Sequence, residues 1–470
     1  MNKRFKYLFK NIGILTISNF SSKILVVLLV PLYTSILSTK DYGTYDLSMS
    51  TVQLLYPVLT ANIVDAVMRF SMDKKYSNGE VAEIGIRYIG RSILMAVALT
   101  VCIQALHLMP TIDGLELLIL LYYASYVLNQ YFVQLAKGME KVSIMAIAGV
   151  IGTLVMTGTN LLLLLVFKLG LKGFYLAHIL SQTVPIIYYI LALQYWKIPR
   201  KPIDRKRLSI EMKRYSVPLI FTTVGWWANN AADKYVVAFI CDVSANGILS
   251  VAYKIPQILN VVQGIFIQAW HISAVKECEA KDAQNFYGIT FIYVNILMSV
   301  CCAGFIFLNR FLARFLYAND FYIAWRYVPF LLISNVVNTA SGFIGSILSA
   351  KKDSSAMAKS AIYGTGANIV MNVVLVYLVG IQGATIATLL SSYIIYRVRL
   401  RSAKELTETA YYWKVIATWV LLCAQAAVEI YSGSLLVELG LMTVVLLLNL
   451  NVLKKVFFMG LQIICGKNGK

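Results

Sequence analysis

The chain has 470 residues, of which 59% are hydrophobic and only 14% are charged, and its mean hydropathy is +0.71. Soluble globular domains carry charge on roughly a quarter of their residues, so this composition excludes an ordinary soluble protein. The net charge of +20 does not indicate a nucleic-acid partner, because basic residues bias the loops of membrane proteins toward the cytoplasm.

Apolar runs recur along the chain in sequence order. Between Ile12 and Phe458, run after run is long enough to cross a ~30 Å hydrocarbon layer as an α-helix. We therefore predict an all-α polytopic membrane protein with about fourteen transmembrane helices. These helices are expected to begin near residues 12, 43, 84, 112, 142, 171, 213, 246, 283, 321, 355, 381, 409 and 433.

Basic residues alternate between the two sides of this predicted bundle. Most of the 42 Lys and Arg residues lie in every second loop, among them the long loop 197–214. The remaining loops carry only Lys40, Lys168, Lys172, Arg310 and Arg314. Cytoplasmic loops are enriched in Lys and Arg, so both termini are predicted to be cytoplasmic. A single miscounted helix would invert the alternation beyond it.

The chain also contains an internal repeat. At one constant spacing, Gly170, Gly173, Ala177 and Ser181 are matched by Gly380, Gly383, Ala387 and Ser391, and Lys141 is matched by Lys351. The two copies lie an even number of predicted helices apart, so they run in the same direction through the membrane. We therefore predict two parallel repeats related by an axis along the membrane normal. Convergence of short glycine turns is the alternative.

Four predicted helices carry polar residues on one face. The helix near residue 213 has Thr222, Trp226, Asn229, Asn230 and Asp233, with Lys234 at the margin, and the helix near 246 has Ser250, Tyr253, Lys254, Gln257, Asn260 and Gly264. The matching helices of the first half have Thr16, Asn19 and Lys23, and Asp46, Ser50, Gln53, Thr60, Asn62, Asp65 and Arg69. Polar faces at matching positions of the two halves predict one shared central cavity.

The charges in these faces are costly unless they meet water or one another. A charged side chain near the bilayer centre costs ~2.5–3.5 kcal/mol even on a lenient scale. Lys23 has no acid on its own helix and is assigned to the cavity lining. For Asp233 and Lys254, a structural ion pair is the alternative. Asp65 and Arg69 are spaced i to i+4, which is also compatible with a local salt bridge.

A cationic cavity at membrane depth predicts an anionic ligand. A lysine 4 Å from a phosphate charge gains ~4 kcal/mol at an effective dielectric constant near 20, so a phosphate or diphosphate head group fits. Arg87 and Arg91 are candidates for the cytoplasmic mouth, and snorkelling to the interface is the alternative. Four prolines fall inside the polar-faced helices, where they permit bending or impose a static kink: Pro31, Pro57, Pro218 and Pro256.

Several stretches, in this order, resemble a known family. They are PLYTSILSTKDYGTYDLSMS (31–50), ADKYVVAFICDVSANGILSVAYKIPQILN (232–260), AWRYVPFLL (324–332) and GIQGATIATLLSSYI (380–394). Together they resemble the Wzx-type oligosaccharide flippases of the multidrug/oligosaccharidyl-lipid/polysaccharide (MOP) exporter superfamily, and the likeness runs over most of residues 11–400. No single motif among them is decisive.

This resemblance implies a specific architecture and activity. Two six-helix lobes, residues 1–205 and 206–402, would surround a central cavity, and residues 403–470 would add two helices and a cytoplasmic tail. The implied substrate is an undecaprenyl-diphosphate-linked oligosaccharide, such as an O-antigen, capsule or exopolysaccharide repeat unit. The protein would move it from the cytoplasmic to the outer leaflet of the bacterial inner membrane by alternating access.

The resemblance also assigns roles to the polar residues. Substrate binding falls to Lys23, Lys234, Lys254, Asn19, Asn229, Asn230 and Gln257, and ion coupling or charge pairing to Asp65 and Asp233. Arg69, Arg87 and Arg91 would line the cytoplasmic mouth. No catalytic residue, metal site or cofactor is expected, and a proton or sodium gradient would drive the cycle. Membrane lipids and the polysaccharide polymerase or export machinery are the expected partners, and nucleic acid is not.

Three other functions remain open from the sequence. A multidrug or cation antiporter of the same superfamily would favour an acidic, aromatic cavity, and a lipid II flippase would share the diphosphate chemistry. From a different class, a membrane glycan polymerase or glycosyltransferase would need acids and bases on a large loop or outer helix. The longest loop, 197–214, is mostly basic, and His107, His178 and His271 are isolated in sequence.

Overall fold

A computed structural model of the protein describes residues 29–73, 75–107, 112–199, 205–277, 283–403 and 412–464. Within these ranges the chain is helical almost throughout, and a helix begins near every predicted start. Eight helical segments are long and apolar enough to cross a membrane, and one bent pair of helices passes the same test together. The all-α polytopic class is therefore confirmed. The total of about fourteen spans stays a prediction, because the first expected helix lies mostly outside the described residues.

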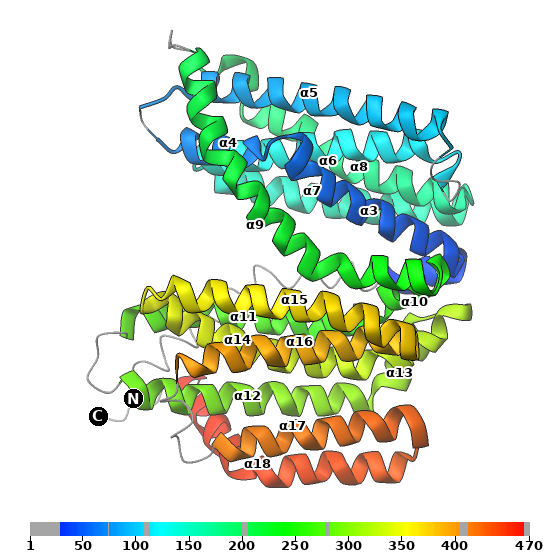
Figure 1. Ribbon diagram of the computed structural model, residues 1–470, viewed down its shortest axis with the longest axis vertical. Coiled ribbons are helices and arrows are strands. Elements are labelled where there is room, and N and C mark those ends of the chain that lie inside the picture. Colours follow the sequence, from blue (N-terminus) through cyan, green and yellow to red (C-terminus); the bar gives the residue numbers. More distant parts are fainter. Residues whose placement is uncertain are drawn as a thin grey trace. The chain divides into compact units, whose positions relative to one another are not determined.

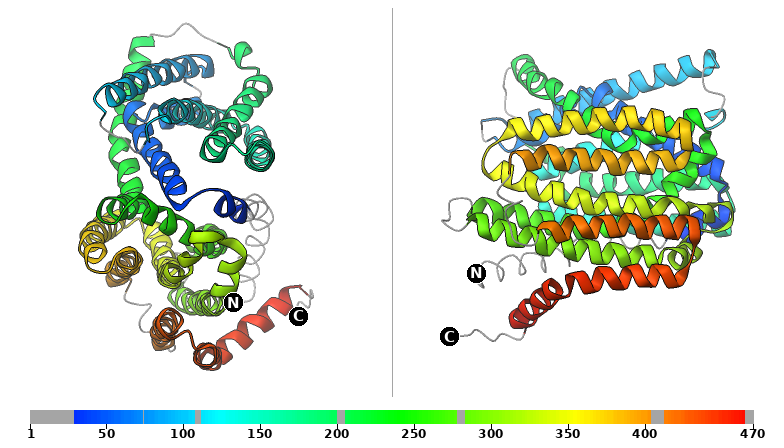
Figure 2. Two further views of the ribbon diagram at one scale, coloured as in Figure 1. Left: turned by 90° about the vertical axis from the view of Figure 1, so that its right-hand side faces the viewer. Right: turned by 60° about the horizontal axis from the view of Figure 1, so that its bottom comes forward.

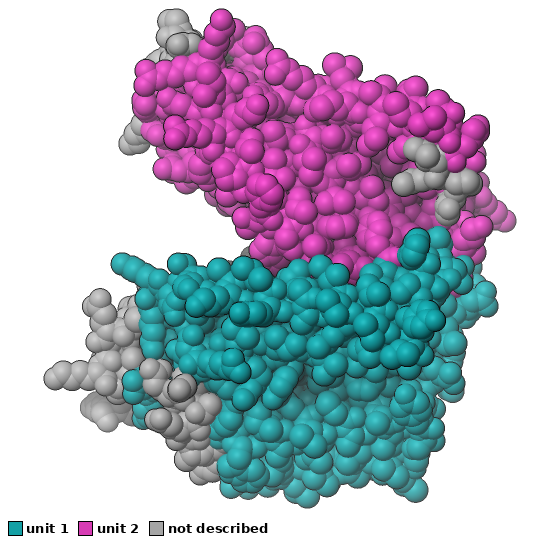
Figure 3. Space-filling view, in the orientation of Figure 1, with its two compact units in different colours: residues 1–35, 236–470 teal, residues 36–235 magenta. Residues whose placement is uncertain are grey.

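The chain divides into two compact units, which Figure 3 distinguishes by colour. We call Ile36–Tyr235 the N-terminal unit, and Met1–Ser35 together with Val236–Lys470 the C-terminal unit. The boundary falls inside the long helix α9 (Arg205–Ile240). The predicted lobes, divided after residues 205 and 402, stay a prediction.

The N-terminal unit is built around α6 (Glu116–Gly138), which packs against helices α4, α5 and α8. Its other elements are α3 (Thr39–Leu59), α4 (Ile63–Ser71), α5 (Asn78–Ala105), α7 (Val142–Asn160), η2 (Leu161–Val166), α8 (Gly170–Ala192), η3 (Tyr195–Lys197) and most of α9. The Tyr131 hydroxyl on α6 is buried and donates to the Ala82 carbonyl on α5 at 2.8 Å. This hydrogen bond satisfies a polar group that burial would otherwise penalise.

The C-terminal unit is built around α14 (Val328–Ala350), the most buried apolar segment of the chain. Its other elements are most of α2 (Val30–Ile36), α10 (Val243–Ala252), α11 (Lys254–Glu277), α12 (Ala283–Phe307), α13 (Asn309–Leu316), η4 (Asn319–Tyr327), α15 (Ser354–Val379), α16 (Ile381–Arg401), α17 (Tyr412–Ala427), η6 (Val428–Ser432) and α18 (Leu435–Ile464). Trp270 of α11 stacks on Phe343 of α14 with ring centroids 4.0 Å apart, and its indole N–H donates to the Phe343 carbonyl at 3.2 Å.

The two glycine turns predicted as a repeat form equivalent hairpins, α7–α8 in the N-terminal unit and α15–α16 in the C-terminal unit (Figures 1 and 2). The first glycine of each pair has a positive φ, +52° for Gly170 and +63° for Gly380, which favours glycine. The second glycine, Gly173 or Gly383, lies so close to the preceding helix that a Cβ atom would meet its backbone. Matching glycines thus have matching physical roles, which supports an internal repeat rather than chance convergence.

The matching of Lys141 with Lys351 is wrong. The turns before α7 and α15 share one hydrogen-bond pattern, in which Lys141 N–H donates to Ala136 O at 2.8 Å and Asp353 N–H donates to Leu348 O at 2.9 Å. The equivalent of Lys141 is therefore Asp353. The first copy is two residues longer between its turns, and the additional length lies at residues 167–169, which separate η2 from Gly170, whereas Gly380 directly follows α15.

A polar cluster joins the start of α9 to the loop before α5, outside the apolar part of α9. Tyr76 donates its hydroxyl to the Glu211 carboxylate at 2.5 Å, and Arg207 Nε donates to the same carboxylate at 3.1 Å. These two hydrogen bonds, that from Tyr76 first, lower the pKa of Glu211. Nearby, Ser77 donates its hydroxyl to the Pro199 carbonyl.

Acid is expected to weaken this cluster. A carboxylate whose folded pKa lies below its unfolded value stabilises the fold above the unfolded pKa, and the contribution is lost as pH falls through the folded pKa. Glu211→Gln should therefore lower the melting temperature at neutral pH, and the difference from the wild type should shrink below pH ~4. Thermal unfolding across pH measures this, with the exposed Glu140→Gln as the control. A constant difference at all pH values would contradict the assignment.

Candidate functional site

The second predicted polar-faced helix is not continuous. It consists of α3 and α4, which meet at an angle of 62° across a break at residues 60–62. Ala61 and Asn62 adopt left-handed φ values of +52° and +49°, and the Asn62 N–H donates back to the Pro57 carbonyl at 2.8 Å. Pro57 and the short polar residues that follow it account for the break.

The polar side chains at this break form hydrogen bonds within α3 and α4. The Thr60 hydroxyl donates to the Tyr56 carbonyl at 2.7 Å, and the Asn62 amide donates to the Asp65 carboxylate at 2.8 Å. Asp65, in the first turn of α4, is therefore held by Asn62. Among the ion pairs of the described residues, none joins Asp65 to Arg69, and Arg69 is exposed. Broken helices with polar groups at the break are common at the ion and substrate sites of transporters.

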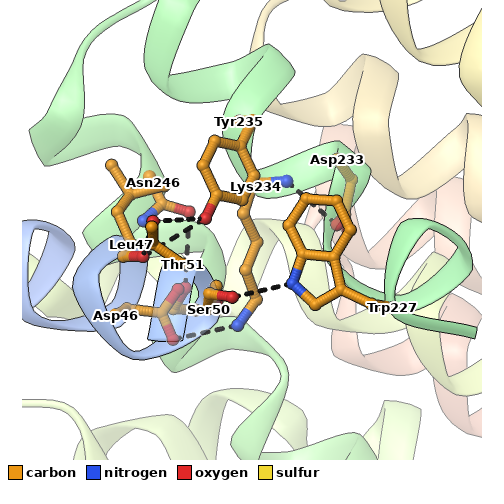
Figure 4. A network of polar contacts seen from close by, with 10 residues as sticks. Asp46, Leu47, Ser50, Thr51, Trp227, Asp233, Lys234, Tyr235 and Asn246 are labelled. Atoms are coloured by element: carbon orange, nitrogen blue, oxygen red, sulfur yellow. Dashed lines mark hydrogen bonds and ion pairs between the residues drawn. The ribbon is translucent and has the colours of Figure 1, made fainter. Parts of the chain in front are cut away.

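An ion pair joins α9 to α3 (Figure 4). Lys234 Nζ lies 2.9 Å from Asp46 Oδ1, and the two side chains are only 20% and 16% exposed. Lys234 also donates its backbone N–H to the Asp233 carboxylate at 2.9 Å. At such low exposure the two charges stabilise each other, and removing either would leave the other poorly solvated.

Two aromatic side chains of α9 also contact α3 near this ion pair, one from before Lys234 in the sequence and one from directly after it (Figure 4). The Trp227 indole N–H donates to the Ser50 carbonyl at 2.7 Å, and the Tyr235 hydroxyl lies 2.7 Å from the Thr51 hydroxyl. The rings of Trp227 and Tyr235 are 5.4 Å apart. These contacts orient the α9 face that carries Lys234 toward α3.

The other residues of α9 that were predicted to lie in the site differ in their exposure. Asn229 and Asn230 are exposed, and Asn230 donates to the Trp226 carbonyl at 2.6 Å. Trp226 is itself 69% exposed, whereas Asp233 is only 5% exposed. The chain thus presents amides and an indole ring on one part of α9 and buries the acid beside Lys234.

Other predicted site residues lie elsewhere in the chain. Lys254 is the first residue of α11, directly after a break at Tyr253 that divides the expected single helix into α10 and α11, and Gln257 is exposed one turn later. Asn335 of α14 donates to the Pro256 carbonyl at 3.0 Å and so supports this first turn. Asn19 and Lys23 lie outside the described residues. A common cavity for all these groups stays a prediction.

Of the three arginines predicted for the cytoplasmic mouth, Arg69 is exposed on α4, and Arg87 and Arg91 are exposed on α5. Arg87 forms an ion pair with Glu83 at 2.6 Å, and Glu83 also pairs with Arg205 of α9 at 3.1 Å. Arg91 packs over the Tyr88 ring at 5.6 Å. Their role at a mouth stays a prediction.

The sequence analysis missed the partner of Lys234. Asp46 was recognised in the polar face of its helix but was not assigned to the site, and Asp233 and Lys254 were weighed as a pair instead. The sequence did mark Asp46 as a candidate, because Asp46 begins the same polar face as Ser50 and Asp65. Whether this face contacts the polar face of α9 depends on how α3 and α9 are rotated about their axes, and the periodicity of polar residues does not determine that rotation.

The geometry can now be compared with known proteins. Residues 8–271, more than half of the chain, match the family model of a polysaccharide biosynthesis protein. The chain belongs to this family. The comparison of this polysaccharide biosynthesis protein with curated proteins gave no match.

Solved structures show the fold of this polysaccharide biosynthesis protein. The lipid II flippase MurJ in an inward closed conformation is 14% identical, with a TM-score of 0.69 over 95% of this chain and 99% of that chain. An inward-facing multidrug resistance MATE family transporter of the MOP superfamily is 14% identical, with a TM-score of 0.62 over 83% and 96%. The Vibrio cholerae MATE transporter VcmN is 13% identical, with a TM-score of 0.58 over 87% and 100%. The expected MOP exporter fold is confirmed.

Proposed function

We propose that this protein is a flippase for an undecaprenyl-diphosphate-linked oligosaccharide. It moves the repeat unit from the cytoplasmic to the outer leaflet of the bacterial inner membrane by alternating access, with both termini in the cytoplasm. A polysaccharide polymerase or export machinery would then take up the unit. The observation that carries this proposal is the family match of residues 8–271, on a chain in which Lys234 of α9 forms an ion pair with Asp46 of α3.

The Lys234–Asp46 pair supports an anionic head group as the ligand. A diphosphate carries more negative charge than one carboxylate, so it competes with Asp46 for Lys234 wherever both are shielded from water. Lysine is a compact point charge with rotatable donors, which suits a cation that must exchange one anion for another during a cycle.

The exposed part of α9 supports a glycan beside that head group. Trp226 offers a large ring with one polar N–H, and Asn229 and Asn230 offer amides, which together can contact the apolar faces and the hydroxyl groups of sugars. An acidic, aromatic site for cationic drugs would instead place its carboxylates without neighbouring lysines. Here the half-buried Asp46 and the buried Asp233 are both in contact with Lys234.

We further propose that a proton or a sodium ion resets the transporter through Asp65 or Asp233. Asp65 lies at the break between α3 and α4, where Asn62 already donates to one of its oxygens. In transporters with broken helices, unwound backbone carbonyls at such a break coordinate the coupling ion.

Reconstituted vesicles test the proposed function. The full chain is placed in proteoliposomes with a polyprenyl-diphosphate oligosaccharide that carries a fluorescent sugar, and a membrane-impermeant quencher reports the fraction in the outer leaflet over time. We expect protein-dependent translocation, accelerated by an imposed proton or sodium gradient. The same assay with fluorescent lipid II, and an efflux assay with a cationic dye, are run in parallel.

Each of these measurements tests one alternative function. Faster movement of lipid II than of the oligosaccharide lipid would identify a lipid II flippase, and dye efflux without lipid movement would identify an antiporter. New glycosidic bonds in the product would identify a glycan polymerase. Any of these three results would overturn the proposal.

A further inference from the structure

A half-buried arginine lies between three helices of the C-terminal unit and belongs to none of the groups described above. Arg399 is two residues before the end of α16. Its guanidinium Nε donates to the Ser360 hydroxyl of α15 at 3.0 Å, and Nη1 donates to the Ser341 carbonyl of α14 at 2.9 Å. Among the ion pairs of the described residues, none includes Arg399. The guanidinium is thus held in place by uncharged acceptors, without a counter-ion.

This guanidinium keeps donors for a ligand. An arginine side chain has five N–H groups, and the two hydrogen bonds to α14 and α15 use two of them. The Ser360 hydroxyl donates its own hydrogen to the Met357 carbonyl at 2.7 Å, which leaves its oxygen to accept from Arg399. Gly345 of α14 makes room, because a Cβ atom there would lie 2.8 Å from Arg399 Nη1. A fixed, partly accessible fork of this kind matches the oxygens of a phosphate group.

Further basic residues gather at the same end of these three helices. The turn 351–353 joins the end of α14 to the start of α15, and α16 runs back along α15, so that α16 also ends here. Residues 341–403 contain a single acid, Asp353, whose carboxylate accepts a hydrogen bond from the first turn of α15. The other basic residues of this segment are all exposed at this end: Lys351, Lys352, Lys359, Arg397 and Arg401. Basic clusters at the cytoplasmic ends of transmembrane helices attract anionic lipids, and basic pockets between such helices bind their head groups.

The internal repeat shows that helix packing alone does not need this arginine. Counted from the equivalent turns of the two hairpins, Tyr189 takes the place of Arg399 and Ala148 takes the place of Ser360. Tyr189 and Ala148 are each only 1% exposed, so the N-terminal unit fills the same positions with an aromatic ring and a methyl group. A bound ligand therefore accounts for the cation in the C-terminal unit better than packing does.

We propose that Arg399 binds the phosphate group of an anionic phospholipid at this basic end of α14, α15 and α16. The loop charges predict that this end faces the cytoplasm, where the membrane surface is negative. The free N–H groups of Arg399 donate to the phosphate oxygens, and the exposed lysines and arginines around it attract the rest of the head group. The lipid fastens the ends of three helices together and is distinct from the transported lipid.

Lipid binding to the purified full chain tests this proposal without transport. The protein in detergent is titrated with phosphatidylglycerol, and native mass spectrometry counts the bound lipids at each concentration. Arg399→Gln should weaken binding of the tightest lipid by at least about tenfold, because glutamine keeps a donor but loses the charge and the fork. Arg397→Gln removes the same charge from an exposed residue of the same helix turn, so it is the matched control and should bind within about twofold of the wild type. Equal weakening in both variants would overturn the proposal, because it would indicate general attraction to a basic surface.

Thermal unfolding separates lipid binding from folding. The rise in melting temperature on adding phosphatidylglycerol is compared with the lipid-free value of each variant, and Arg399→Gln should lose most of this rise. If Arg399→Gln does not fold, Arg399→Lys, which keeps the charge without the fork, should still bind the lipid at least about threefold more weakly than the wild type. Wild-type binding by the folded variant would overturn the proposal.

A competition experiment identifies the source of the phosphate. Inorganic phosphate and a polyprenyl-diphosphate oligosaccharide are each added to the wild type with bound phosphatidylglycerol, and neither should displace the tightest lipid at equal concentration. Displacement by the oligosaccharide lipid would overturn the proposal and place Arg399 on the path of the transported lipid. Displacement by inorganic phosphate would overturn it in favour of a site for the free anion.

Discussion

Gly383→Ala is expected to abolish most of the folded protein. A Cβ atom at this position would lie 2.1 Å from the Leu375 carbonyl oxygen and 2.6 Å from the Val376 nitrogen. Both are backbone atoms of the facing helix α15, so the new methyl group cannot be accommodated by a side-chain rotation. Forcing α15 and α16 apart should cost ~3 kcal/mol or more, measurable as a lower melting temperature and a loss of monodisperse protein in detergent.

Two other glycines provide a graded comparison. Gly366 lies inside α15 with no neighbour within 4 Å of a built Cβ atom, so Gly366→Ala should be neutral or stabilising by up to ~1 kcal/mol. Gly173 is the repeat equivalent of Gly383, but its Cβ would lie 2.9 Å from the Leu169 side chain and 3.2 Å from the Leu163 carbonyl. Gly173→Ala should therefore have an intermediate effect. Equal melting temperatures for the Gly383→Ala and Gly366→Ala variants would show that α15 and α16 are not in close contact at Gly383.

The repeat was predictable from the sequence because its signal is local. Gly170 and Gly380 begin their helices with a backbone conformation that favours glycine, and Gly173 and Gly383 follow one turn later where two helices nearly touch. Both constraints act within a few residues of each glycine. Helix starts were predictable for a similar reason, since apolar length and the basic loops directly mark where the chain enters and leaves a membrane.

The breaks within helices were only partly predictable. Pro57 and Pro256 were recognised as sites of bending, but the polar-faced helices were still expected to be continuous. The structure divides them at residues 60–62 and at Tyr253. A proline permits a break, but whether one forms depends on the tertiary contacts around it. Near Pro256, Asn335 of α14 donates to the Pro256 carbonyl.

Charge partners were the least predictable feature. The polar stripes predicted a cavity lining and assigned Lys234 to substrate binding without a charge partner, whereas the structure pairs Lys234 with Asp46, almost the whole N-terminal unit away in sequence. The pair between Glu429 and Arg310 also joins distant segments. Such pairs depend on helix rotation and tilt, which are set by packing across the unit rather than by local pattern.

Lys234→Ala is expected to reduce translocation of the oligosaccharide lipid by at least about tenfold and also to destabilise the protein. Removing one partner of a largely buried ion pair typically costs ~3–5 kcal/mol, because the other charge is left unpaired. Asp46→Asn should destabilise for the same reason. A loss of transport in either single variant is therefore ambiguous, since a poorly folded protein also fails to transport.

The double variant Asp46→Asn with Lys234→Gln separates binding from folding. Both side chains keep their approximate size and can hydrogen-bond to each other without charge, so the melting temperature should recover toward that of the wild type, as a double-mutant cycle quantifies. If Lys234 exchanges Asp46 for the diphosphate, translocation should stay at least about tenfold below the wild-type rate, since a 1.4 kcal/mol loss is already tenfold. Lys213→Ala, an exposed lysine on the same helix, should transport normally. Wild-type translocation by the folded double variant would mean that the pair only locks α9 to α3 and that the head group is bound by other cations.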